Sequence, residues 1–174
     1  MSPPTFRLAD PIADRAVLLD INTEYVGWVF AQIEAMSGMT AREILGAEVA
    51  EYVPTVIDKV CGDPPPLGAF YLVEHGGGVV AMGGLRRSGD GIAELKRVYV
   101  RPAGRGHRLG EALTRRLLDD ARAFGYRTLR LDTLPFMRAA QAVYESLGFT
   151  DCAPYPVEMP AAFRAHIRYM ALTL

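Results

Sequence analysis

The sequence predicts an α/β fold built on a mixed sheet. Segments with helical spacing of apolar residues alternate with segments that alternate like strands, and glycine- and proline-rich breaks separate them. Their order is strand, two helices, three strands, helix, strand, helix, strand, which is typical of an α/β domain. The chain has 174 residues, a length that suits one domain, so we expect residues 1–174 to form one domain.

The N-terminal part predicts a short strand and a long helix. Residues 5–8 alternate weakly between apolar and polar, which indicates the strand. Residues 10–36 carry apolar side chains at helical spacing, and Ser37-Gly38 is expected to end this helix.

A second helical region is predicted to follow. Thr40 has the character of an N-cap, and Glu43 stands three residues later in the capping-box position. The apolar pattern then continues to Val60. Pro54 lies inside it and is expected to split or kink the helix.

Three antiparallel strands are predicted next, over 69–74, 78–85 and 91–100. The turn sequences His75-Gly76-Gly77 and Ser88-Gly89-Asp90-Gly91 separate them, and such spacing favours a meander.

The remaining elements alternate between helix and strand. A glycine-rich loop opens an amphipathic helix that ends near Gly125, and a later helix ends at Gly148, because glycine commonly follows a helix C-terminus. A proline-broken segment precedes the final strand. The expected ranges are a loop at 101–110, a helix to about 124, a strand at 127–132, a helix at 136–147, the broken segment at 153–160 and a strand at 166–174.

Composition bounds the class of protein. Half of the residues are hydrophobic and 22% are charged, and the formal net charge is −1, so nothing global indicates nucleic acid or an anionic membrane as a partner. No stretch reaches the ~18 apolar residues of a membrane span. Cys61 and Cys152 lack the spacing of a zinc site, so we expect no metal. The N-terminus does not resemble a signal peptide, and a cytoplasmic protein is expected.

The loop at 101–110 is a candidate anion site. A loop that opens a helix offers unpaired backbone N–H groups and the positive end of the helix dipole. Gly104, Gly106 and Gly110 would let the backbone approach a phosphate closely, and several arginines add local charge. Taken alone, the same pattern also fits a basic surface turn before a helix.

Two motifs here resemble those of the GNAT N-acetyltransferases. Residues 94–102 with 105–110 (Glu-Leu-Lys-Arg-Val-Tyr-Val-Arg-Pro, then Arg-Gly-His-Arg-Leu-Gly) resemble the central acetyl-CoA motif, and 139–149 (Ala-Ala-Gln-Ala-Val-Tyr-Glu-Ser-Leu-Gly-Phe) resembles the second. The resemblance covers about 67–149. It implies a mixed, mostly antiparallel central sheet flanked by helices, with acetyl-CoA as cosubstrate and an amine as acceptor.

The chain departs from the family pattern at two positions. The first glycine of the family's loop is Arg108 here, so the backbone there must accommodate a side chain, which itself could contact a phosphate. The asparagine often found early in the second motif corresponds to Met137, which removes one polar contact.

The resemblance implies a set of acetyl-CoA contacts in the two motifs. They are Val98, Tyr99, Val100, Arg105, Gly106, His107, Arg108, Leu109, Gly110, Glu111, Met137, Ala140 and Tyr144.

Three residues are implied to be catalytic. Amine attack on a thioester needs a proton acceptor, stabilisation of the oxyanion and a proton for the thiolate. Glu94 corresponds to the general base of some family members, whereas other members use only water. Lys96 lies on the same strand face and is an alternative partner for Glu94. The backbone N–H of Val98 is the implied donor to the thioester carbonyl. Tyr144 is the implied proton donor, although its apolar neighbours also fit a core aromatic.

The acceptor site is less defined by the sequence. Aromatic residues and two loops are candidates for its walls, and two glutamates are candidates for attracting a cationic amine. The candidates are Tyr25, Trp28, Tyr71 and Tyr155, the loops around Ser37 and Pro154, and Glu24 or Glu34.

Other functions remain open at this level. A coenzyme A-binding sensing domain would keep the loop without turnover, and another acyl-CoA could replace acetyl-CoA. A nucleic-acid-binding module would use the arginines at 97–108, against which the near-neutral charge argues. The resemblance also makes a homodimer through the C-terminal strand plausible.

Overall fold

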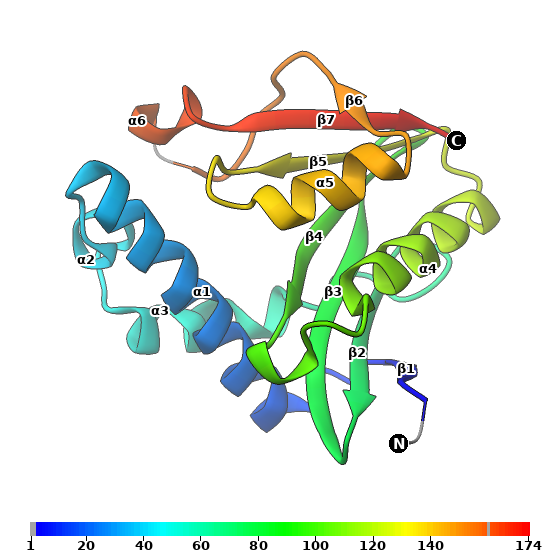
Figure 1. Cartoon of the computed structure of the whole chain (residues 1–174), viewed down its shortest axis with the longest axis horizontal. Coiled ribbons are helices and arrows are strands. Elements are labelled where there is room, and N and C mark those ends of the chain that lie inside the picture. The colour runs from blue at the N-terminus through cyan, green and yellow to red at the C-terminus, as the bar shows by residue number, and fades with distance from the viewer. Residues whose placement is uncertain (1–2, 160) are drawn as a thin grey trace.

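The centre of the molecule is a mixed sheet (Figure 1). The computed structural model describes residues 3–159 and 161–174, so Pro160, which ends the predicted proline-broken segment, lies outside the described residues. Neighbouring strands are antiparallel except for the parallel pair β4–β5, which confirms the predicted fold class. The sheet order is β1-β2-β3-β4-β5-β7-β6, with β1 at Thr5–Leu8, β2 at Ala69–His75, β3 at Gly78–Gly89, β4 at Ile92–Val100, β5 at Thr128–Thr133, β6 at Thr150–Asp151 and β7 at Arg168–Thr173.

Helices cover both faces of the sheet (Figure 1). Alternation along β2 shows why: Ala69 and Tyr71 join one apolar core with α4 (Leu109–Ala123) and α5 (Arg138–Ser146). Phe70 and Leu72 point to the opposite face, where they join a second core with α1 (Arg15–Ser37), α2 (Ala41–Leu45) and α3 (Val49–Val56).

The N-terminal helices follow the sequence signals with one exception. Helix α1 ends at Ser37 and is capped by Gly38, whose φ is 75°, and the capping box of Thr40 and Glu43 is formed. The break in the second helical region lies at Gly46, whose φ is 78°, and not at Pro54. Pro54 lies inside α3 without ending it, although proline has no N–H to donate to the carbonyl one turn earlier.

Strand β3 is longer than predicted, and four short elements were not predicted. Strand β3 continues past the predicted end at residue 85, since Arg86 and Arg87 pair with β4 although both are polar. The short elements η1 (Ile57–Lys59), η2 (Pro102–Gly104), β6 and α6 (Ala161–Arg164) are too short to produce a periodic pattern.

Strands β4 and β5 part soon after they pair. Their parallel register contains three residue pairs and ends at Glu94 opposite Arg130, whereas β4 continues to Val100. Figure 1 shows the two strands diverging from this point. Beyond Glu94, the β5-facing backbone groups of β4 therefore have no strand partner among the described residues.

A β-bulge lies in the part of β4 that has left β5. Gly84 pairs with Lys96 and Met82 pairs with Tyr99, so Gly83 faces two residues of β4, Arg97 and Val98. Arg97 has a φ of 55°, in the left-handed region that side chains rarely adopt. The bulge changes the direction of successive side chains at this position.

None of the helices among the described residues is long and apolar enough to cross a membrane. The described His, Cys, Asp and Glu side chains form no group of three or more that would hold a metal ion.

Candidate active site

A cavity of about 590 Å³ opens where β4 leaves β5. Its walls come from α1, the end of β4, the loop before α4, the first turn of α4, and α5. The structure brings the predicted acetyl-CoA contacts together on these walls, with His107 excepted. The residues so placed are Val98, Tyr99, Val100, Arg105, Gly106, Arg108, Leu109, Gly110, Glu111, Met137, Ala140 and Tyr144.

One end of this larger cavity has the character of an anion site. The N–H of Ala112 is the first in α4 to reach a helical acceptor, the carbonyl of Arg108 at 3.0 Å, so the amides just before it have no helical partner. The loop leaves room for a ligand beside its glycines. A Cβ atom on Gly106 would meet nothing within 4 Å, and one on Gly110 would meet only Val100, at 3.6 Å. These features fit a phosphate group.

Arg108 stands where the family loop has a glycine, and its backbone has a glycine-like conformation. Its φ is 54° and its ψ is 26°. The guanidinium donates to the Glu111 carboxylate at 2.7 Å, and Arg115 donates to the same carboxylate at 2.9 Å. These two bonds lower the pKa of Glu111. Arg108 thus lines the cavity while its guanidinium is paired with the Glu111 carboxylate.

His107 does not contribute to this cavity. Its ring packs beside His75, with 4.7 Å between the ring centroids. In this loop Gly106 precedes it with a φ of 83°, and His107 is not among the residues that line the cavity. The expected cofactor contact of His107 is not supported by this geometry.

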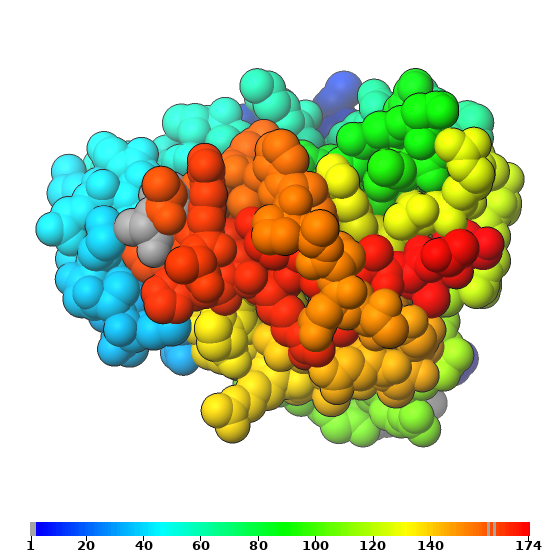
Figure 2. Space-filling model, turned by 90° about the horizontal axis from the view of Figure 1, so that it is seen from above, coloured from blue at the N-terminus to red at the C-terminus, as the bar shows by residue number. Residues whose placement is uncertain are grey.

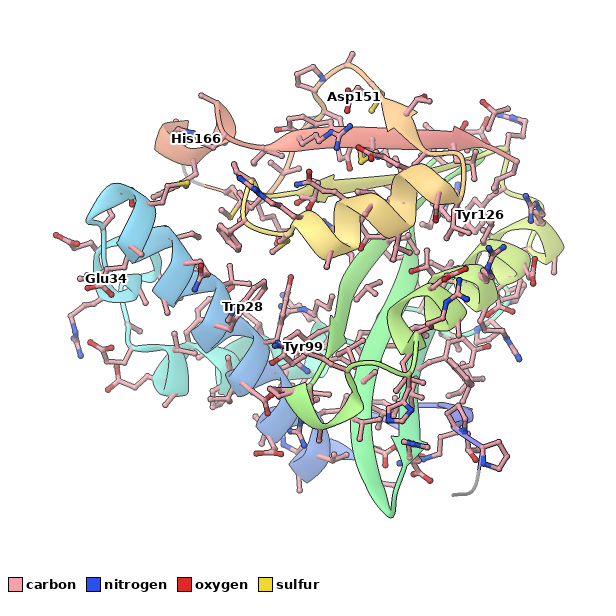
Figure 3. All side chains as sticks on the ribbon, viewed as in Figure 1. Trp28, Glu34, Tyr99, Tyr126, Asp151 and His166 are labelled. Atoms are coloured by element: carbon pink, nitrogen blue, oxygen red, sulfur yellow. The ribbon has the colours of Figure 1, made fainter. Side chains whose placement is uncertain are left out.

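Aromatic side chains form the wall next to α1. Trp28 packs against Tyr99 with 6.3 Å between centroids and edge-on against Phe136 at 5.5 Å, and Tyr25 lies 5.3 Å from Tyr99. Figure 3 shows Trp28 extending from α1 toward Tyr99. The Tyr99 hydroxyl donates to Glu24 at 2.8 Å, and burial together with this bond raises the pKa of Tyr99 to about 12. This wall is built from aromatic rings, and Tyr99 is held in it by ring contacts with Tyr25 and Trp28 and by the hydrogen bond to Glu24.

Tyr144 lies on the α5 side of the cavity. Only 7% of the residue is exposed, and its ring packs against Phe149 at 5.8 Å. Burial raises the pKa of Tyr144, so the phenol keeps its proton at neutral pH. Its hydroxyl forms no hydrogen bond with the described residues, which leaves the proton available to a ligand.

Glu94 does not line this cavity. The residue is 3% exposed, and its carboxylate accepts from Lys96 Nζ at 2.6 Å and from Ser88 Oγ at 2.8 Å. Burial alone would raise the pKa of Glu94, but the charge of Lys96 and these bonds lower it. The structure thus shows the alternative that the sequence left open, the ion pair with Lys96.

A second, smaller cavity of about 430 Å³ lies beside the first, and Tyr25 lines both. Its walls come from α1, α3, the end of β3, the bulge of β4 and the segment at 157–159. Its charged lining residues are Lys59, Arg86, Lys96, Arg97, Asp132 and Glu158.

Asp132 is a site residue that the sequence reasoning missed. It lines the smaller cavity and accepts a hydrogen bond from Lys96 Nζ at 2.9 Å. It lies near the carboxyl end of β5, on the side where β4 departs. A carboxylate at the end of a parallel strand was the available signal, but the sequence could not place β5 beside β4.

The residues predicted for the acceptor site divide into two groups. Tyr25 and Trp28 do line the larger cavity. Tyr71 donates to Asp120 at 2.8 Å beneath α4, and Tyr155 packs under the Arg130 guanidinium at 3.7 Å, so both belong to the surrounding structure. Ser37, Glu24 and Glu34 line neither cavity. Pro154 itself does not line a cavity either, but Val157, Glu158 and Met159 of the loop around it line the smaller one.

Comparison with known proteins agrees with this geometry. The model of the "Acetyltransferase (GNAT) family" matches residues 39–149. The uncharacterized N-acetyltransferase YjgM of Escherichia coli is 34% identical over 142 residues, which are 80% of this chain and 81% of that protein.

Solved structures show the same fold. A putative acetyltransferase from Salmonella typhimurium, determined with its cofactor acetyl-CoA, has a TM-score of 0.63 and 25% identity over 99% of this chain and 94% of that one. The PaiA N-acetyltransferase from Thermoplasma acidophilum, in complex with coenzyme A, has a TM-score of 0.72 and 15% identity over 99% of this chain and all of that one, 100%. Sequence motifs, sheet topology and family match agree, and the chain belongs to the acetyltransferase (GNAT) family.

Proposed function

We propose that the protein transfers the acetyl group of acetyl-CoA directly to a primary amine of a small molecule or peptide. The observation that carries the proposal is the meeting of two cavities at Tyr25. The larger cavity combines an anion site with an apolar wall, as a nucleotide thioester requires. The smaller cavity offers a separate space for the acceptor.

The larger cavity fits acetyl-CoA, which supplies a thioester as acyl donor. We assign the diphosphate to the amides at the start of α4, with Arg105 beside them. Beyond Glu94, where Val98 and Val100 follow, the β5-facing edge of β4 has backbone groups that no strand of the described residues uses. This edge is suited to hydrogen bonding along an extended amide-bearing arm.

Two residues of this chain act on the reacting atoms in the proposed mechanism. The Val98 N–H donates to the carbonyl oxygen as negative charge develops on it. The Tyr144 hydroxyl holds a proton for the departing sulfur, because its raised pKa keeps the phenol protonated. Both residues line the larger cavity.

The amine must lose a proton, and a carboxylate is the expected acceptor. We propose Asp132 for this role, directly or through water, because it lines the cavity assigned to the amine. Glu94 remains the alternative from the sequence. Lys96 bridges the two carboxylates, so substitution of either one changes the environment of the other.

The proposal is tested by thermal unfolding with acetyl-CoA and with adenosine diphosphate as the control ligand. A ligand at about 100 times its Kd stabilises the folded state by about 2.7 kcal/mol. We expect a larger shift with acetyl-CoA, and a reduced one in Arg105→Gln. The matched control is Arg122→Gln, on the exposed last turn of α4, which should behave as the parent. No shift at millimolar acetyl-CoA would refute the proposed site.

Turnover is tested by release of the coenzyme A thiol in the presence of a panel of amines. Release that depends on the amine supports the acetyltransferase. Saturable binding of acetyl-CoA without release on any amine would instead favour the sensing domain.

We also propose that β7 mediates a homodimer. Strand β6 pairs with β7 at only two positions, opposite Ala171 and Met170. The Cys152 N–H donates to the Tyr169 carbonyl next to them, and no strand longer than β6 among the described residues covers that edge. Figure 2 shows β7, in red, along the upper face of the molecule. Light scattering would give twice the 19.0 kDa chain mass if the dimer forms, and the single-chain mass if it does not.

A further inference from the structure

Arg97 is a cation in the wall of the smaller cavity that forms no ion pair with the described residues. It lies in the bulge of β4, and its guanidinium donates to the Asn22 Oδ1 atom at 3.0 Å. Asn22 is fully buried and uncharged, and its amide group donates to the Leu18 carbonyl at 2.8 Å. That second bond fixes the side-chain amide with its oxygen toward Arg97. No described carboxylate forms an ion pair with Arg97.

The unpaired charge of Arg97 is not an isolated feature of this cavity. Lys96 is neutralised by Glu94 and Asp132, whereas Arg86, which also lines the cavity, forms no ion pair with the described residues. Glu158 is the remaining acid on the wall. The lining thus has an excess of positive charge on the side of β3 and β4.

Arg97 is partly buried, and a cation withdrawn from water without a close counter-charge is unfavourable. Burial lowers the pKa of Arg97, which reflects the unfavourable environment of its charge. An anionic ligand group would supply the missing partner. A carboxylate suits a guanidinium, which can bind it through two parallel hydrogen bonds.

The opposite wall of the smaller cavity is mostly apolar, and its charged residues are Lys59 and Glu158. Its side chains come from α1, the region of α2 and α3, and the segment before α6, and include Val29, Leu45, Val56, Val60 and Met159. A ligand that fills the cavity therefore meets positive charge on the sheet side and hydrocarbon on the helix side.

We propose that the acceptor is an amino acid with an apolar side chain, and that Arg97 binds its carboxylate. This inference deepens the proposed function and rests on it. The chain order supports a short separation between amine and carboxylate, because Arg97 directly precedes Val98, and consecutive Cα atoms are about 3.8 Å apart. Asp132 lines the same cavity and lies within reach of the amine as the proposed proton acceptor.

Paired acceptors test the proposal. Leucine and 3-methylbutylamine share the same amine and hydrocarbon and differ by the carboxylate, and leucinamide replaces the charge with a neutral group. We expect kcat/KM for leucine to exceed that for either analogue by at least about tenfold, the usual effect of a hydrogen bond to a charged group. Equal values would overturn this inference while leaving acetyl transfer to amines intact.

Substitutions of Arg97, with Arg87 as a control, sharpen the test. Arg97→Gln should reduce the preference of leucine over 3-methylbutylamine about tenfold or more, and Arg97→Lys should retain part of it. Arg87→Gln is the matched control, because Arg87 is exposed on β3 and lines neither cavity. A preference that survives in Arg97→Gln would overturn the assignment of Arg97.

A binding measurement tests the inference without turnover. Calorimetry on the protein saturated with coenzyme A would compare N-acetylleucine with N-(3-methylbutyl)acetamide. Tighter binding of the carboxylate by about tenfold, lost in Arg97→Gln, supports the inference. Equal binding, or binding of neither compound, overturns it. Failure of the protein to bind acetyl-CoA is a different result, which overturns the proposed function itself.

Discussion

Gly83 of β3 lies directly against Val98 of β4. A Cβ atom on Gly83 would stand 3.1 Å from both the Cα and the Cγ2 atoms of Val98, and 3.1 Å from Leu113 Cδ2. Gly83 faces the bulge of Arg97 and Val98, so the absence of a side chain there allows the bulge to lie close to β3. The position of the proposed oxyanion donor thus depends on a glycine in the neighbouring strand.

Gly83→Ala should therefore disturb both stability and the site. The added methyl group forces the bulge or α4 to shift, and such overpacking costs about 1–3 kcal/mol. We expect a loss of that size in urea unfolding and weaker binding of acetyl-CoA. Gly78→Ala is the control on the same strand, since nothing lies within 4 Å of its Cβ position. If the two variants behave alike, close packing at Gly83 does not position Val98.

Tyr144→Phe should lower kcat with little effect on the KM for acetyl-CoA. The substitution removes the proposed proton donor and keeps the ring that packs on Phe149. General acid catalysis typically contributes about 10²–10⁴-fold, and because thiolates leave readily we expect the lower end. Because the pKa of Tyr144 is raised, ionisation of its hydroxyl should cause no decrease in kcat below about pH 10. An unchanged kcat would assign Tyr144 to the core alone.

The two carboxylates around Lys96 can be separated by kinetics. If Asp132 accepts the amine proton, Asp132→Asn should reduce kcat/KM about 10²-fold or more, and the decrease should shrink as pH rises and the free amine accumulates. Glu94→Gln should affect the rate less, because Glu94 lies outside both cavities. The opposite ranking would return the role of base to Glu94.

Glu94 should instead influence stability as a function of pH. Its pKa is lowered in the folded protein, so its contribution is present above the unfolded pKa, about 4.3, and is lost as pH falls through the lower folded value. We expect Glu94→Gln to be less stable than the parent by about 1–3 kcal/mol at pH 7. The difference should narrow below about pH 4.3. A difference that does not depend on pH would mean that packing, not charge, is responsible.

Much of the fold was predictable because its signals are local. The capping box at Thr40 and the glycines at Gly38, Gly125 and Gly148 mark helix ends that the structure confirms. Most of the larger cavity was also predictable, since its lining comes largely from the two contiguous motifs, to which α1 adds Tyr25 and Trp28. By contrast, the break at Gly46 was missed, because Pro54 gave the stronger local signal.

The smaller cavity was not predictable, because it depends on contacts between distant segments. Asn22 and Arg97 are 75 residues apart, and Asp132 meets Lys96 only because β4 and β5 are parallel neighbours. Tyr71 was misplaced for the same reason: its face of β2 is covered by α4. Periodicity assigns a residue to a face of an element but does not say which element covers that face.

Arg108 gives a test of backbone conformation in the cofactor loop. Its left-handed φ of 54° is unfavourable for a residue with a Cβ and favourable for glycine. Arg108→Gly and Arg108→Ala both remove the exposed ion pair with Glu111, so their difference reports the backbone alone. We expect the glycine variant to be more stable by about 1 kcal/mol.

Arg115 is the matched control for this comparison. It also pairs with Glu111, but it lies within α4, where glycine is less favourable than alanine by about 1 kcal/mol. The order of stability should therefore be reversed, with Arg115→Ala above Arg115→Gly in urea unfolding. If Arg108→Ala equals or exceeds Arg108→Gly, the loop does not hold residue 108 in the left-handed region in solution. The amides at the start of α4 would then be arranged differently from those proposed to bind the diphosphate.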